Sequence, residues 1–99
     1  MDDFEYWQEK VLKWAEDRNL LHGSSPKDQF HKLIQESAEL SESLCKNKDP
    51  IDDYGDILVV LIIMMAQSGV AVSDALAYAY NEIKDRKGKM VNNVFIKDE

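Results

Sequence analysis

The amino-acid sequence predicts an all-α fold, built as a four-helix bundle-like monomer that homo-oligomerisation completes. Apolar residues recur at intervals of three and four through most of the chain, which is the spacing of one helix face. Residues that start and end helices separate these segments. The 99 residues, of which 44% are hydrophobic and 31% charged, suffice for a single domain covering residues 1–99 and are too few for two.

The first predicted helix covers about residues 3–21. Its apolar residues lie at helical spacing and define one face: Phe4, Trp7, Val11, Trp14, Ala15 and Leu21. We expect Trp7 and Trp14 to be core residues, with base stacking as the alternative use of their rings. The segment His22-Gly23-Ser24-Ser25 ends this helix.

The second predicted helix covers about residues 26–46. Ser25 is its expected N-cap, Pro26 suits the first helical position, and Asp28 lies where a capping box needs its acceptor. The next break is Asn47-Lys48-Asp49-Pro50. Because this connection is short, the second and third helices should pack antiparallel.

The third predicted helix covers about residues 50–68 and ends before Gly69, where a C-terminal glycine belongs. Every residue from 57 to 66 is apolar, so this helix must be covered on all sides. Three short helices can hardly do that, and a second chain is the simplest cover, which predicts a homodimer or homotetramer. A buried strand is the alternative because Val and Ile favour strands; the Met and Leu content favours the helix.

The fourth predicted helix covers about residues 73–87. Ser73 is its expected N-cap, and Gly88 marks its end. One side should face inward, formed by Ala75, Leu76, Ala79, Tyr80 and Ile83. The remaining residues, 89–99, form a short tail in which Val94-Phe95-Ile96 could be extended.

Charge and cysteine content bear on the compartment and the partners. The single cysteine, Cys45, allows no intrachain disulfide, which suits the reducing cytoplasm. A net charge of −7 argues against general nucleic-acid binding. The longest apolar run has ten residues, about half of what a membrane span needs, and the acidic start does not resemble a signal peptide. We therefore expect a soluble cytoplasmic protein with neither nucleic acid nor membrane as partner.

Two acidic motifs on successive predicted helices suggest the chemistry. They are Glu36-Ser37-Ala38-Glu39 and Asp53-Tyr54-Gly55-Asp56. A spacing of three residues puts both carboxylates of a motif on one helix face, with Cβ atoms about 5–6 Å apart. If antiparallel packing gathers the two pairs, their mutual repulsion calls for a divalent cation, and an all-oxygen ligand set suits Mg²⁺ or Mn²⁺. Ordinary solvated helix faces are the alternative, because the chain has 19 acidic residues.

These motifs resemble those of the MazG-like family of all-α nucleoside triphosphate pyrophosphohydrolases, which carry EExxE on one helix and ExxD on the next. The likeness spans about residues 25–96, and the segment 80–90 is similar to the end of short, phage-type members. Gln35 stands where the family often has its first Glu. Asp53 stands where the family often has Glu, which keeps a carboxylate but shortens its reach by one methylene.

The resemblance implies hydrolysis of an NTP or dNTP to the monophosphate and pyrophosphate. It implies metal-binding and catalytic roles for Glu36, Glu39, Asp53 and Asp56, and contacts to phosphate or base from Asn81, Lys84 and Arg86. One carboxylate, such as Glu39, could instead act as general base. Independently, four of the twelve Lys and Arg residues fall within residues 84–89, which fits either a pyrophosphate grip or cations at a helix C-terminus. A phosphoribosyl-ATP pyrophosphohydrolase-like enzyme and a non-enzymatic helical dimerisation or regulatory module are the alternatives.

Overall fold

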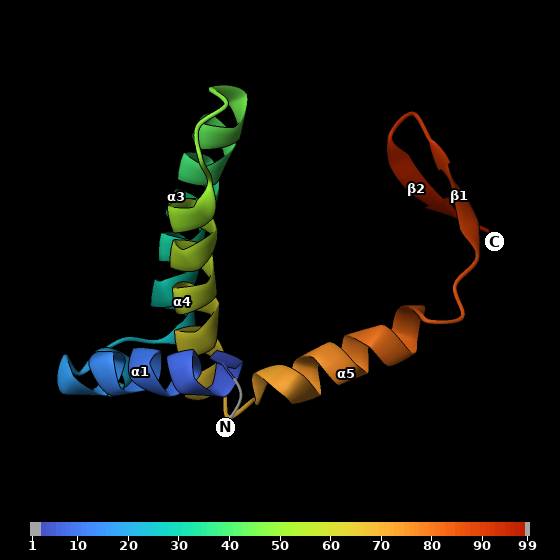
Figure 1. The fold of residues 1–99 in the computed structure, drawn as a ribbon. Helices are drawn as coiled ribbons and strands as arrows, with labels where there is room; N and C mark the ends of the chain where they lie inside the picture. Colours follow the sequence, from blue (N-terminus) through green and yellow to red (C-terminus); the bar gives the residue numbers. More distant parts are fainter. Residues whose placement is uncertain (1–2, 99) are drawn as a thin grey trace.

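A computed structural model describes residues 3–98, which are mostly helical. In chain order the elements are α1 (Asp3–Asp17), α2 (Leu20–Gly23), α3 (Pro26–Cys45), α4 (Ile51–Gln67), α5 (Val72–Ile83), β1 (Gly88–Val91) and β2 (Val94–Lys97). α3 and α4 lie side by side and antiparallel, and α1 crosses one end of the pair (Figure 1). α5 leads away from this core to the hairpin of β1 and β2.

Local sequence sets both ends of α3, as predicted. The Ser25 side chain accepts a hydrogen bond from the backbone N–H of Asp28 at 3.2 Å, and the Asp28 carboxylate accepts one from the N–H of Ser25 at 2.9 Å. At the other end Asn47 is left-handed, with φ of 55°. The N–H of Lys48 then donates to the carbonyl of Ser43 at 2.9 Å, which closes the helix.

The expected third helix is α4, and the buried-strand alternative is excluded. Gly69 has φ of 70°, and the N–H of Val70 donates to the carbonyl of Met65 at 2.9 Å, which is the predicted glycine-terminated end. The start differs slightly from the prediction, because Pro50 is the N-cap residue. Asp49 still satisfies one free donor there, since its carboxylate accepts from the N–H of Ile51 at 3.0 Å.

The predicted first helix is wrong as one continuous element. α1 ends at Asp17, and Asn19 adopts a left-handed conformation with φ of 58°, which asparagine tolerates better than most residues. The chain then forms the separate short helix α2. Gln67 at the end of α4 holds α2 in place: its Nε2 lies 3.3 Å from the carbonyl oxygen of Leu20 and 3.0 Å from that of Ser24.

The last helix departs from the prediction, whereas β2 confirms the extended conformation expected for Val94-Phe95-Ile96. α5 begins after Ala71 rather than at a Ser73 cap, and it ends at Ile83 rather than near 87. The tail is an antiparallel hairpin, so the fold is helical with a small sheet rather than purely all-α. Asn92 and Asn93 have φ of 51° and 69°, the values of a two-residue turn with both central residues left-handed.

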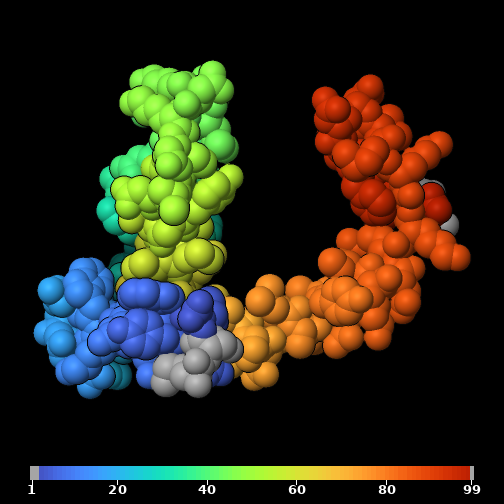
Figure 2. Space-filling view, in the orientation of Figure 1, coloured from blue at the N-terminus to red at the C-terminus, as the bar shows by residue number. Residues whose placement is uncertain are grey.

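α5 does not complete a bundle within this chain. A break bends it by 98° from α4, and its expected inward face is exposed, with Leu76 at 66%. The chain exposes 7953 Å², whereas a compact monomer of this mass exposes about 5,800 Å². Its radius of gyration is 16.3 Å against about 12.6 Å for a compact domain of this length. Figure 2 shows the same open shape, with α5 and the hairpin standing apart from the other helices.

Within residues 3–98, no single helix is both long and apolar enough to cross a membrane. Only α4 and α5 taken together reach the required length and composition, and the 98° bend separates them.

The hydrogen bonds of Gln67 predict a measurable contribution to stability. Gln67→Ala removes the side-chain donor of the Leu21 and Ser24 carbonyls, and we expect the free energy of unfolding to fall by about 1–3 kcal/mol. Chemical denaturation followed by circular dichroism measures this loss. Gln8→Ala on α1 is the matched control, and an equal loss in both variants would contradict an anchoring role for Gln67.

Candidate metal centre

Three of the four predicted carboxylates meet between α3 and α4. Glu36, Glu39 and Asp56 each offer an oxygen, and these oxygens all lie within 4.8 Å of one another. Asp53 is not part of this group. Asp53 precedes Asp56 by three residues, which is about 4.5 Å along α4.

Glu36 is the buried member of the cluster, with 5% of its surface exposed. Its Oε1 lies 3.1 Å from Nζ of Lys32, one helical turn earlier on α3. Its Oε2 is buried and has no hydrogen-bond partner among the described residues. Removing a carboxylate oxygen from water without a partner is costly, so this position favours a bound cation.

Neighbouring groups raise the pKa of the other two carboxylates, Glu39 and Asp56. Glu36 raises the pKa of Glu39, first because its carboxylate would accept a hydrogen bond from the protonated Glu39 carboxyl and then through its charge. Desolvation, and then the charges of Asp52, Glu36 and Asp53, raises the pKa of Asp56. Asp53 therefore acts on the cluster through its charge. Glu39 is exposed, so solvent screens much of its repulsion, whereas Asp56 is half-buried.

The donor set fits a hard divalent cation. It consists of carboxylate oxygens alone among the residues that converge, which suits Mg²⁺ or Mn²⁺ better than Zn²⁺. A divalent ion at this place would partner the orphaned oxygen of Glu36 and remove the repulsion that raises the pKa of Glu39 and Asp56. Sequence reasoning missed Lys32, although its spacing of four residues from Glu36 was a usable signal.

The predicted substrate-binding residues lie elsewhere. Asn81 is on α5, and Lys84 and Arg86 follow it, so the bend after α4 carries all three away from the carboxylates of the same chain (Figure 1). Asn81 and Arg86 line an open hollow of about 610 Å³ at the foot of the hairpin, and Lys84 does not. Its acidic and basic residues balance, since Glu82, Asp85 and Asp98 face Arg86, Lys87 and Lys97. This hollow alone is not an anion site.

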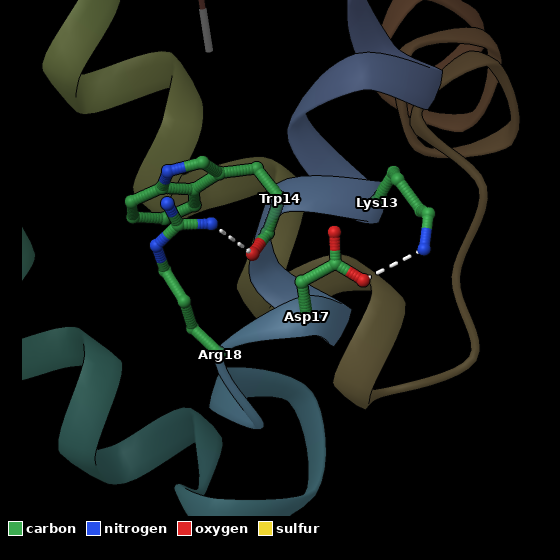
Figure 3. A network of polar contacts seen from close by, with 4 residues as sticks. All are labelled: Lys13, Trp14, Asp17 and Arg18. Carbon is green, nitrogen blue, oxygen red and sulfur yellow. Dashed lines mark hydrogen bonds and ion pairs between the residues drawn. The ribbon is translucent and has the colours of Figure 1, made fainter.

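The expectation that both tryptophans are core residues is wrong. Trp7 is 63% exposed and Trp14 is 45% exposed. α1 instead packs through Ala15, which is fully buried. Both rings line a pocket of about 380 Å³ that also includes Asp56, and Arg18 stacks on Trp14 (Figure 3). The helical spacing of the two residues did place them on one face, but it could not show that this face stays open.

One relative among known proteins is similar over most of this chain. The uncharacterized 18.2 kDa protein in the rep-hol intergenic region of Haemophilus phage HP1 (strain HP1c1) is 39% identical over 72 residues, which are 71% of this chain and 44% of that protein. The chain thus spans less than half the length of the phage relative. No protein-family model and no solved structure matches the chain.

The raised pKa of Asp56 predicts how stability depends on pH. Folding disfavours the ionised carboxylate, so the stability associated with this group is lost as the pH rises through its folded pKa. Asparagine cannot ionise, and metal-free Asp56→Asn should therefore unfold at a higher temperature than the wild type at pH 7. This advantage should shrink as the pH falls toward about 4 and the wild-type carboxyl protonates.

Thermal unfolding in EDTA at both pH values tests this expectation. Glu42→Gln is the matched control, because Glu42 is an exposed carboxylate of α3 that pairs with Lys46 outside the cluster. An Asp56→Asn protein no more stable than the wild type at pH 7 would show that ionised Asp56 does not destabilise the metal-free protein.

Proposed function

We propose that this protein is a magnesium-dependent nucleotide pyrophosphohydrolase that converts an NTP or dNTP to the monophosphate and pyrophosphate. The main support is the convergence of Glu36, Glu39 and Asp56 around the unpartnered buried oxygen of Glu36. Mg²⁺ typically binds through one or two carboxylates together with substrate phosphates, so a phosphorylated substrate follows from the ligand set. The MazG-like motifs that contain these residues supply the reaction type.

In this proposal the carboxylates have different roles. Glu36, Glu39 and Asp56 would hold the metal, and Asp53 adds negative charge one turn away. Bound Mg²⁺ supplies neutralisation of the phosphate oxygens and a more acidic water. Water attacks the α-phosphorus, the bond from this atom to the α,β-bridging oxygen breaks, and pyrophosphate leaves. Alternatively Glu39, the exposed member of the cluster, would accept the proton of the water instead of binding the metal.

The proposal includes a homo-oligomer, a dimer or a tetramer. The open monomer exposes about 2,200 Å² more than a compact chain of its mass, which is comparable to the area that permanent subunit interfaces bury. Large apolar side chains dominate the exposed faces of α5 and the hairpin, among them Leu76, Tyr80, Met90 and Phe95. A second copy that packs against them would remove this surface from water.

Oligomerisation also explains how the predicted substrate residues reach the metal centre. The basic cluster of residues 84–89 cannot approach the carboxylates of its own chain, because α5 is bent away by 98°. Opposite charges favour contact between this cluster and the acidic faces of α3 and α4 in a second copy. Asn81, Lys84 and Arg86 would then contact the phosphates from the neighbouring subunit.

Two alternative functions predict different experimental results. A phosphoribosyl-ATP pyrophosphohydrolase-like enzyme would use the same metal chemistry on another nucleotide. A non-enzymatic dimerisation or regulatory module would use the exposed apolar faces alone. Stabilisation by Mg²⁺ separates the module from both enzymes, because an ion that binds only the folded state raises the unfolding temperature.

A substrate panel tests the proposed reaction directly. The purified protein is incubated with each common NTP and dNTP and Mg²⁺, and pyrophosphate and orthophosphate are measured separately. We expect pyrophosphate release that EDTA abolishes. Stabilisation by Mg²⁺ without release from any nucleotide of the panel would favour the phosphoribosyl nucleotide, and the absence of both would favour the module.

Single carboxylate variants should remove turnover without unfolding the protein. Glu39→Gln or Asp56→Asn deletes one charged ligand of the metal and should lower the rate of pyrophosphate release by at least about a hundredfold. Circular dichroism should be unchanged, and Glu42→Gln should keep wild-type activity. Wild-type activity in either variant would show that the substituted residue is not a metal ligand on which turnover depends.

Mixing two inactive variants tests whether the site is shared between chains. Glu39→Gln removes a metal ligand, and Arg86→Met removes a phosphate contact. If the two residues act from different subunits, refolding the variants together should restore a substantial part of the activity. Some sites then receive an intact Glu39 from one subunit and an intact Arg86 from the other. Activity no greater than that of the separate variants would place both residues in the same chain's site.

A further inference from the structure

A pocket between α1 and α4 adjoins the metal centre. Its volume is about 380 Å³, and it is lined by Trp7, Lys10, Val11, Trp14, Asp56 and Val59. Asp56 belongs to both the pocket and the carboxylate cluster, so the two sites are neighbours that share this residue. The chain has two tryptophans, and both are in this pocket.

The Trp14 ring is held by its neighbour. The Arg18 guanidinium lies over it, 4.6 Å from the ring centroid, and Nη1 of Arg18 donates to the backbone carbonyl of Trp14 at 3.1 Å (Figure 3). Trp7 is steadied by the edge of the Tyr6 ring, with the centroids 4.8 Å apart. Two large aromatic side chains are thus partly fixed, yet 63% and 45% exposed. Rings that are fixed before binding lose little conformational freedom when a flat ligand stacks on them.

We propose that this pocket binds the nucleobase of a nucleoside triphosphate whose phosphates bind at the metal centre. The inference rests on the proposed function and identifies how that site selects nucleotides over other phosphoanhydrides. Every nucleobase has a π face that stacks on an aromatic side chain. Lys10 lines the same pocket, and its ammonium lies over the Tyr6 ring, 5.4 Å from the centroid. Turned toward the pocket, it would donate to a carbonyl oxygen or ring nitrogen of the base.

The composition of the pocket favours a nucleotide over a second protein chain. An apolar cover from another subunit would bury Asp56 without a partner, which is costly. A metal-bound nucleotide instead brings a cation to Asp56 and a flat ring to the tryptophans. A neighbouring pocket offers the contrast, because its walls are wholly apolar and include Phe4, Leu61, Met65 and Leu76. That second pocket has the composition expected of a subunit interface.

The experiment uses two probes that differ in the base. One is an NTP analogue with a methylene group between the α- and β-phosphorus atoms, which cannot be hydrolysed there. The other is inorganic tripolyphosphate, which has the phosphates alone. With Mg²⁺ present, we expect the analogue to quench the intrinsic tryptophan fluorescence and tripolyphosphate to bind with little quenching. Because both tryptophans line the pocket, the fluorescence reports on this pocket alone.

Variants of Trp14 give the decisive comparison by calorimetry. Trp14→Leu should weaken binding of the analogue on the order of tenfold and leave tripolyphosphate binding unchanged, which also shows that the variant is folded. Trp14→Phe keeps an aromatic face and should restore most of the affinity.

Three results would overturn the proposal in distinguishable ways. Equal binding of both probes, with no effect of Trp14→Leu, would reject the base pocket and leave the metal centre intact. Failure of both probes to bind with Mg²⁺ would reject the proposed function and the pocket with it. A smaller sedimenting species in Trp14→Leu alone would mean that a second copy of the chain covers the ring.

Discussion

The antiparallel packing of α3 against α4 is the contact on which the rest of this structure depends. The buried residues of α4 are Val60, Ile62 and Ile63, and the contact with α3 brings acidic residues of both helices together. Hydrophobic burial holds the helices together, and the carboxylates repel one another within the same contact. The packing that stabilises the chain therefore also assembles its charged cluster.

The carboxylate cluster lowers the stability of the metal-free chain. Glu36 is buried with one oxygen paired to Lys32 and the other without a partner, and the cluster raises the pKa of Glu39 and Asp56. Lys32 compensates only in part, because one ammonium group cannot balance several converging carboxylates. Replacing these residues with neutral ones would remove this repulsion, so the charged cluster costs the metal-free chain stability.

The open shape of the chain is due to its other half, which consists of α5 and the hairpin. Gly69 ends α4 sharply, and α5 then departs at 98°, so the apolar residues of α5 and the hairpin find no cover in their own chain. The same bend moves the basic cluster away from the carboxylates. The exposure of the apolar residues of α5 and the separation of the basic cluster from the carboxylates thus both follow from one turn of the backbone.

The sequence by itself determined the helix ends that short-range hydrogen bonds encode. The capping box of Ser25 and Asp28 and the left-handed Gly69 lie where the sequence predicted them, because these interactions involve residues only a few positions apart. The grouping of Glu36, Glu39 and Asp56 was also predictable, since helical spacing and a short antiparallel connection suffice to gather them.

Only the tertiary structure decided which faces are covered. Periodicity identified an apolar stripe on α1 and on α5, but it could not show that Trp7, Trp14 and Leu76 stay exposed, because burial depends on the direction in which each helix leaves the core. Asp53 lies outside the converging group, and α2 is separated from α1 by the left-handed Asn19 and held by the long-range bonds of Gln67. These outcomes depend on contacts between residues far apart in the chain, which local spacing does not encode.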